Sequence, residues 1–508
     1  MERKCDMIKI PKVSYTCDDG FPVTLTEPGD RKYATDGAEV AYKAVNTDFE
    51  VTINGLPCEV KSCRVSAIPF NRPWPGFQRD LDQSEEAGFI AFSADETVEL
   101  RVKRKQSFEG ALVRPLSKNV KTDVCDGEVV FTLSDHGSYV LEFGDTHNVL
   151  HIFFDPIKEY PKAKDATVYF GPGMHFPGVI NLRDNDTVYI DREAIVFGSI
   201  FAKGVKNVKI FGGGVLDNSN EARLLEHCYA PFTKGCFRIY ESENIDVSDI
   251  ILLNSSTWVL SMFWCSHIKI DNVKIVGHWR YNTDGIDVVN SDHVSIKNCF
   301  IRSFDDTVSI KAIYDYQKPV EAITVENCVL WCGWGKTCEI GIETQGIEYK
   351  SIAFRNCDVI HSAYGIMTIS NGNYADMHHI IFEDMRIEMQ RGEPQILQTS
   401  EAQKYDSKGE VLLPNLIANV NKQFYIRRKD DSRDYDVKLG NIHDITYRNI
   451  CVTTEGEPFL PVIRIKSLDG SVIFRNFQFE NLYLNGEKQT DFSKFSMDVA
   501  NAEGITIC

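Results

Sequence analysis

The segments "HVSIKN" (293–298), "AITVEN" (322–327) and "SIAFRN" (351–356) alternate apolar and polar residues and end in asparagine. Similar segments recur on both sides: "NVKIFG" (207–212), "NIDVSD" (244–249), "HIKIDN" (267–272), "HIIFED" (379–384), "DITYRN" (444–449) and "SVIFRN" (471–476). A short strand repeated every 23 to 29 residues, without a helical pattern, is typical of a parallel β-solenoid. We therefore expect an all-β chain.

Stacked coils place equivalent residues above one another at the strand spacing of about 4.8 Å. Asn298, Asn327 and Asn356 should then form a ladder of side-chain amides at one turn. The cysteines that follow them, Cys299, Cys328 and Cys357, should stack as buried, inert thiols. We prefer this interpretation to metal binding, because no CxxC pair has a zinc-like second half.

The first part of the chain predicts a different β-structure. Short strands are expected at 49–55, 97–105, 128–135 and 137–144, separated by turn residues, as in a β-sandwich. We predict an N-terminal β-sandwich over residues 1–160 and a β-helix over 165–508. One gap between repeats is 65 residues long and suggests an insertion at about 392–440.

The composition limits the partners and the location of the protein. With 73 acidic and 55 basic residues, the 508-residue chain has a formal charge of -18 and should repel nucleic acid. No stretch is apolar for long enough to span a membrane, and the N-terminus lacks the apolar stretch of a signal peptide. The 15 cysteines are typical of reduced thiols, so a cytoplasmic location is expected unless a leader has been removed. The oligomeric state stays open.

Three acidic side chains stand out between residues 280 and 311. Aligning "DGIDV" (284–288) with "DTVSI" (306–310) places Asp284 and Asp306 one coil apart in one column, with Asp305 beside them. Mutual repulsion among three carboxylates requires either a cation or a carboxyl whose raised pKa keeps it protonated. The alternatives are aspartates that cap turns and a calcium site. Glycoside hydrolysis requires one protonated acid and one ionised base.

"NTDG" (282–285) followed by "DD" (305–306) resembles the signature of the polygalacturonase-like glycosidases, and "FGGGVLD" (211–217) resembles their glycine segment. The resemblance covers roughly residues 165–480. It implies a right-handed parallel β-helix and an inverting hydrolase that needs no cofactor or metal. It further implies that Asp305 is the general acid and that Asp284 and Asp306 activate the water.

The chain departs from this family at two places. Where the family has a histidine in the column of the acids, Cys338 or Glu339 is expected here, and Met367 is expected where the family has the arginine of an Arg-x-Lys grip on galacturonate. The "IRIK" at 463–466 places Arg464 and Lys466 on a later coil, where we expect a surface charge pair.

A β-sandwich before a β-helix is similar to the dextranase and isopullulanase family, which acts on neutral α-glucans. With the two departures, this layout slightly favours a neutral α-linked sugar over galacturonan. Such a sugar needs aromatic platforms, and Tyr281 is one aromatic residue on the coils around the acids, although core packing is the simpler role for any one of them. The candidate substrate-binding residues are Asn282, Lys311, Glu339, Trp279, Trp334 and Tyr364.

Two other functions stay open. The β-helix could bind a polysaccharide without cleaving it, as the lost histidine and Arg-x-Lys would allow. It could instead be a polysaccharide lyase, which would need calcium and a basic residue near it. The three retained aspartates favour an oligo- or polysaccharide hydrolase.

Overall fold

The computed structural model describes residues 8–11, 32–33, 40–41, 44–67, 84–161, 163–221, 235–391, 413–423 and 438–508. Almost all of its regular structure is β-strand. Two short 3-10 helices span Leu116–Lys118 and Ala163–Asp165. Within these residues, no helix is long and apolar enough to cross a membrane.

The N-terminal part contains two sheets that share one hydrophobic core. One sheet consists of β1 (Ile8–Lys9), β6 (Lys61–Ser66), β7 (Ser84–Ala94), β9 (Leu112–Arg114), β12 (Gly137–Glu142) and β13 (Leu150–Asp155). The other consists of β4 (Phe49–Ile53), β5 (Leu56–Cys58), β8 (Val98–Arg104), β10 (Thr122–Cys125) and β11 (Glu128–Leu133). A separate pair joins β2 (Lys32–Tyr33) and β3 (Val40–Ala41). Alternating residues such as Val51, Leu100, Phe92 and Phe154 fill the space between the two sheets, which is the layering of a β-sandwich.

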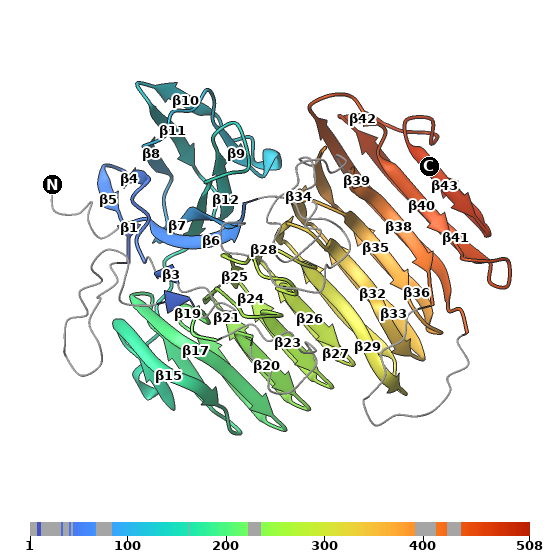
Figure 1. The fold of residues 1–508 in the computed structure, drawn as a ribbon, viewed down its shortest axis with the longest axis horizontal. Coiled ribbons are helices and arrows are strands. Elements are labelled where there is room, and N and C mark those ends of the chain that lie inside the picture. Colours follow the sequence, from blue (N-terminus) through green and yellow to red (C-terminus); the bar gives the residue numbers. More distant parts are fainter. Residues whose placement is uncertain are drawn as a thin grey trace.

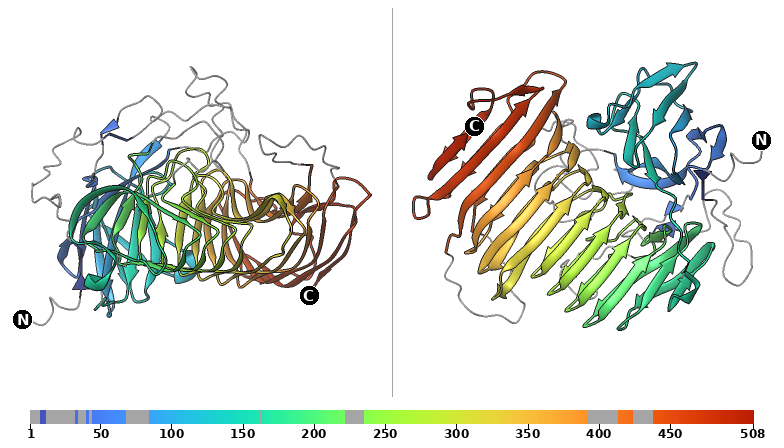
Figure 2. Two further views of the ribbon diagram at one scale, coloured as in Figure 1. Left: turned by 90° about the horizontal axis from the view of Figure 1, so that it is seen from below. Right: turned by 180° about the vertical axis from the view of Figure 1, so that it is seen from behind.

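A right-handed parallel β-helix follows, and its 31 strands form one continuous sheet. Figures 1 and 2 show its coils as a stack of parallel arrows that runs from green to red, with the blue N-terminal sheets beside the first coils. Eight of the nine repeat segments lie in equivalent register on one ladder, in which Ile268, Val294, Ile323 and Ile352 lie directly above one another. The ninth, 471–476, is out of register with them, because Phe477 and not Val472 pairs with Ile445. The fold class predicted from the repeats is confirmed.

Three ladders run along the β-helix. The repeat ladder contains β14 (Val168–Phe170), β16 (Thr187–Ile190), β18 (Lys206–Phe211), β21 (Glu243–Ser248), β24 (Ser266–Asp271), β27 (Asp292–Lys297), β30 (Val320–Glu326), β33 (Glu348–Arg355), β36 (Asp376–Glu383), β39 (Asn441–Glu455), β41 (Phe474–Leu484) and β44 (Ala502–Ile507). Strand β42 (Glu487–Lys488) folds back on β41.

The other two ladders both start with the long paired strands β15 (Gly173–Asn181) and β17 (Ala194–Lys203), because the first part of β17 pairs with β19 and its last part pairs with β20. The second ladder continues through β19 (Val215–Asp217), β22 (Ile251–Leu253), β25 (Lys274–Ile275), β28 (Phe300–Ser303), β31 (Val329–Cys332), β34 (Asp358–Ser362) and β37 (Arg386–Gln390). The third, the site ladder, continues through β20 (Phe237–Tyr240), β23 (Leu260–Phe263), β26 (Ile286–Val289), β29 (Val308–Tyr316), β32 (Lys336–Gly346), β35 (Gly365–Asn371), β38 (Asn415–Asn421), β40 (Val462–Lys466) and β43 (Ser496–Ala500).

Both predicted side-chain ladders are present. The amide of Asn327 donates to Asn298 at 2.6 Å, and that of Asn356 donates to Asn327 at 3.4 Å. All three asparagines have φ between 50° and 55°, a left-handed conformation that asparagine tolerates better than most residues. The three cysteines that follow them are buried in the core of the coil.

The predicted insertion at 392–440 is wrong in part. Strand β38 (Asn415–Asn421) lies within it and pairs with β35 and β40 in the site ladder. The long gap therefore contains a strand of the site ladder. Residues 392–412 and 424–437 lie outside the described residues. The domain boundaries at 160 and 165 stay a prediction.

The N-terminal sheets and the β-helix meet along a mixed interface. Phe89 and Phe153 pack with Phe300 and Trp331 of the second ladder. At one end of this interface, the buried guanidinium of Arg114 forms ion pairs with Glu142 and Glu388. These contacts fix the position of the N-terminal part on the β-helix.

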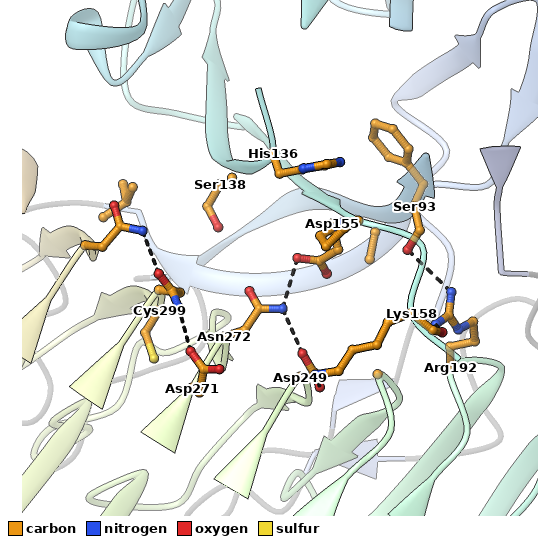
Figure 3. A pocket seen from close by; sticks show the side chains of 18 of the residues that line it. Ser93, His136, Ser138, Asp155, Lys158, Arg192, Asp249, Asp271, Asn272 and Cys299 are labelled. Atoms are coloured by element: carbon orange, nitrogen blue, oxygen red, sulfur yellow. Dashed lines mark hydrogen bonds and ion pairs between the residues drawn. The ribbon is translucent and has the colours of Figure 1, made fainter. Parts of the chain in front are cut away.

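A polar cavity of about 570 Å³ lies along the same interface. In Figure 3, Asn272 lies between Asp155 and Asp249, and its amide donates to both at 3.0 Å. Lys158 and Tyr160 also contact Asp249. The polar side chains here are thus largely paired with one another across the two parts of the chain.

Candidate active site

Asp284 and Asp306 occupy equivalent positions on adjacent coils, as the alignment of the repeats predicts. Strand β26 pairs with β29 so that Ile286 lies beside Val308. The carbonyl of Asp284 accepts from Val259, and that of Asp306 accepts from Gly285, both at 2.8 Å. The same backbone pattern therefore repeats from one coil to the next and stacks the two aspartates.

Asp305 lies next to this column at the turn between β28 and β29. One of its carboxylate oxygens accepts the backbone N–H of Asp306 at 3.0 Å, and an oxygen of Asp306 accepts the N–H of Lys336 at 2.8 Å. Gly335 lies against both carboxylates, since a Cβ there would approach an oxygen of Asp305 and one of Asp306 to 2.5 and 2.6 Å. The turn thus needs glycine at residue 335.

Asp284 is tied to a lysine that lies beneath the site. The ammonium of Lys311 donates to Asp284 at 2.9 Å and to Asp287 at 2.7 Å. It also lies 3.9 Å from the centroid of the Trp258 ring. All four side chains are buried. Lys311, which the sequence suggests as a substrate-binding residue, therefore contacts carboxylates of the site.

The three aspartates lie in different environments. Asp284 is 2% exposed and Asp305 is 9% exposed, whereas Asp306 is partly exposed. Burial, reinforced by the charge of Asp306, raises the pKa of Asp305 to about 8. Burial also raises the pKa of Asp284, but Lys311 opposes this effect. At neutral pH, Asp305 is therefore mainly protonated, while Asp284 has a cation in contact.

The residue that occupies the column of the acids on the next coil differs from the prediction. Val308 pairs with Cys338, so Lys336 and not Cys338 or Glu339 lies in the column of Asp284 and Asp306. Cys338 points into the core of the coil.

Glu339 and Met367 lie on opposite sides of the coil wall. Met367 is a core residue, so it does not face a substrate. Glu339 is buried on the polar side, where Lys336 and Thr368 both donate to it. Burial raises the pKa of Glu339, and Lys336 opposes this effect. The Lys336 ammonium also donates to Ser370 at 2.9 Å.

Aromatic side chains flank the carboxylates. Trp334 stacks on Phe304 with ring centroids 5.6 Å apart, and Tyr281 contacts both rings edge-on. Trp334 and Tyr364 are partly exposed, whereas Trp279 and Tyr281 are almost fully buried. Trp279 and Tyr281 are therefore packing residues, and Trp334 and Tyr364 stay candidates for contact with a sugar.

Two remaining predictions concern the edges of the site. Asn282 is partly exposed and has a φ of 55° next to the aspartates, so it stays a candidate for substrate binding. Arg464 and Lys466 lie at the exposed surface and both pair with Asp498, at 2.8 and 3.3 Å. They form the surface charge pair that was expected.

Sequence reasoning missed two members of the site, Asp287 and Lys336. Asp287 lies in one column with Ser309, Glu339 and Thr368. The signal was present, because each of these polar residues stands alone between two core residues of its strand. Among the described residues, no group of three His, Cys, Asp or Glu side chains is arranged to hold a metal ion.

Comparison with known proteins finds a family that is similar to part of the β-helix. Residues 171–410 match the model of the Glycosyl hydrolases family 28. The match covers 240 of the 508 residues, so it shows similarity to this family over part of the β-helix. This confirms the resemblance to the polygalacturonase-like glycosidases, and the matched residues include Asp284, Asp305 and Asp306.

Individual curated proteins also match only part of the chain. Over 147 residues, the chain is 29% identical to Rhamnogalacturonase A from Emericella nidulans, covering 29% of this chain and 27% of that protein. Over 180 residues, it is 28% identical to an Exopolygalacturonase from Cochliobolus carbonum, covering 32% of this chain and 39% of that protein. The chain thus spans under two-fifths of the length of these relatives.

One solved structure is similar over nearly the whole chain. Dex49A from Penicillium minioluteum covers 97% of both chains with a TM-score of 0.54 and 12% identity. At this identity the likeness shows a shared fold and nothing about activity.

Proposed function

We propose that the protein is an inverting glycoside hydrolase that cleaves an α-linked oligo- or polysaccharide. The observation that carries the proposal is the difference between neighbouring carboxyls in the region that matches family 28. Asp305 is mainly protonated at neutral pH, and Asp284 contacts the ammonium of Lys311 at 2.9 Å. One acid and one base side by side are what glycosidic hydrolysis requires.

The roles follow from these environments. Asp305 donates its proton to the glycosidic oxygen, so that the leaving sugar departs as an alcohol. Asp284 and Asp306, stacked on adjacent coils, accept a proton from the water that attacks the anomeric carbon from the opposite face. The products together contain one added water, and the anomeric configuration of the cleaved sugar is inverted.

We propose a neutral sugar as the substrate. On the coil of Met367 the polar side is formed by Thr368 and Ser370, which are hydroxyls and carry no charge. The ammonium groups of Lys311 and Lys336 are both already paired with carboxylates. Within the part of the chain that the structure describes, these two ammonium groups are therefore not free to pair with the further negative charge that a uronate would add. The names of the relatives, rhamnogalacturonase and exopolygalacturonase, make pectic polymers the competing candidates.

A panel of oligosaccharides tests the proposal. Purified protein is incubated with dextran, pullulan, galacturonan and rhamnogalacturonan fragments, and new reducing ends are measured. Proton NMR of the first product reports its anomeric configuration. Hydrolysis of a neutral α-glucan with inversion is the expected result, and retention of configuration would contradict the mechanism. Cleavage of galacturonan alone would assign an acidic substrate.

The panel also separates the alternatives. A protein that binds a glycan without releasing reducing ends would be a carbohydrate-binding β-helix. A lyase would release products with a carbon–carbon double bond, visible by ultraviolet absorbance, and would lose activity in EDTA. A cytoplasmic location stays a separate proposal, which is based on the acidic, cysteine-containing sequence alone.

A further inference from the structure

Lys311 lies at a place where a charged group is costly. Its side chain is 3% exposed, and its two ion-pair partners, Asp284 and Asp287, are 3% and 0% exposed. A buried ion pair of this kind adds little to stability, because the desolvation cost offsets the attraction. A well-packed apolar side chain would fill the space at least as well. The arrangement therefore needs an explanation other than folding.

The charges around Lys311 do not balance. The ammonium serves two carboxylates, and Asp305 and Asp306 come from the turn before β29. Glu343 on β32 adds a negative charge on the Lys311 side, and Arg238 on β20 adds a positive charge that acts on Asp287. One lysine within this acidic group therefore determines where the remaining protons bind.

Two buried carboxylate oxygens also indicate that this cluster has a role in the reaction. The second carboxylate oxygens of Asp284 and Asp287, Oδ1 and Oδ2 respectively, are buried and accept no hydrogen bond from the described residues. A buried carboxylate oxygen without a donor is expensive. Each aspartate is thus held on one side by Lys311 and is left with a free oxygen for a proton or a reacting water.

We infer that Lys311 and Asp287 are positioning residues with opposite effects on the reaction. Lys311 favours the ionised form of Asp284 that acts as the base, and Asp287 shares the ammonium and weakens this effect. The inference rests on the proposed hydrolase function and adds a control of its pH range. Neither residue is assigned contact with the sugar.

The expected pH shifts have opposite signs. Without Lys311, the positive charge that lowers the pKa of both Asp284 and Asp305 is lost. Without the charge of Asp287, a contribution that raises both pKa values is lost. The rate requires ionised Asp284 and protonated Asp305, so both limbs of the bell-shaped profile move together. A charge at this distance shifts a pKa by about 1–3 units.

The test compares pH profiles of kcat/KM for Lys311→Met and Asp287→Asn. We expect Lys311→Met to move the profile to higher pH and Asp287→Asn to move it to lower pH, each by about one unit or more. Lys311→Arg should keep the wild-type position, because it keeps the charge. The control Lys466→Met removes an exposed lysine of the Asp498 pair and should leave the profile unchanged. Lower rates at an unchanged pH optimum in both variants would overturn the inference.

A double variant keeps the test decisive if Lys311→Met alone does not fold. Lys311→Met leaves two buried carboxylates without a cation, and if it does not fold, the double variant with Asp287→Asn restores the charge balance. This double variant should return toward the wild-type profile, and a profile that stays wild-type in position for Asp287→Asn but moves to higher pH in the double variant would count against the inference.

The pH dependence of unfolding by urea tests the inference without a substrate. A carboxyl whose pKa is raised in the folded state lowers the free energy of unfolding of the protein as the pH rises from about 4 through that pKa. Lys311→Met should extend this loss to higher pH, and Asp287→Asn should shorten it. Equal profiles would reject the positioning roles. If the wild type cleaves no glycan, the hydrolase proposal fails, while the unfolding profiles still decide the roles of Lys311 and Asp287.

Discussion

Replacing Asp305 by asparagine removes one proton from the candidate site and keeps the shape of the side chain. With a pKa of about 8, roughly nine in ten Asp305 side chains are protonated at pH 7. At its ordinary pKa of 3.8, fewer than roughly one in a thousand would be. General acid catalysis contributes about 10²–10⁴-fold to the rate. Asp305→Asn should therefore lower kcat by about that factor, with little change in substrate binding.

The assay compares two substrates of the same sugar. A natural glycoside needs the proton from Asp305, because its leaving group is a poor one, whereas an aryl glycoside with an acidic phenol departs without it. The kcat of Asp305→Asn should fall by the full factor given above on the natural glycoside and by much less on the aryl glycoside. The matched control is Asp292→Asn, because Asp292 lies outside the site and pairs with Ser266 and His293. Equal losses on both substrates would refute Asp305 as the acid.

Stability gives a second measurement of the same substitution. A carboxyl whose folded pKa is raised stabilises the fold least above that pKa, so Asp305 costs stability as the pH rises from about 4 to about 8. Asparagine carries no charge and removes this cost. Asp305→Asn should therefore be more stable than the wild type toward urea at pH 8, by up to a few kcal/mol. If the stability difference between Asp305→Asn and the wild type is the same at pH 4 and pH 8, Asp305 has an ordinary pKa.

Further predictions follow from other contacts. Wild-type activity should fall above about pH 8, because Asp305 loses its proton there, and a profile that is flat to pH 10 would contradict this. Gly335→Ala should reduce kcat by about 10²-fold through displacement of the two acids and should also lower the melting temperature, since the added Cβ meets the backbone nitrogen of Asp306 at 2.5 Å as well as the carboxylate oxygens. Arg114→Met should cost about 3–5 kcal/mol in urea unfolding, because Glu142 and Glu388 are left buried without their cation. EDTA should leave activity unchanged, and loss that calcium restores would favour a lyase.

The fold could be predicted from the sequence because a solenoid repeats its physical signal. Each coil places β-branched residues such as Val294 and Ile323 at the same inward position, and each turn places an asparagine such as Asn327 in a left-handed conformation. The stacking of Asp284 and Asp306 follows from the same period. The repeat does not predict where a strand lies when the connection before it changes length. Strand β38 therefore falls inside the stretch that the sequence predicts to be an insertion.

The protonation of the site could not be predicted from the spacing of its residues. It depends on burial and on contacts between coils, such as the contact of Lys311 on β29 with Asp284 of the preceding coil. Asp287 was visible beside Asp284, but only the structure shows that it competes for the same ammonium. A pKa of about 8 for Asp305 results from the environment of the turn and not from its sequence.

The position of Lys336 connects the register of the coil to the choice of substrate. It lies in the column of the acids, where the related glycosidases are expected to have histidine, and its ammonium is held by Glu339 and Ser370. A lysine so close to Asp306 could in principle bind a uronate. Glu339 already neutralises it, however, and a uronate would have to displace that buried carboxylate, which is costly. A neutral sugar needs no such displacement, because its hydroxyls can share the hydrogen bonds of Ser370 and Lys336.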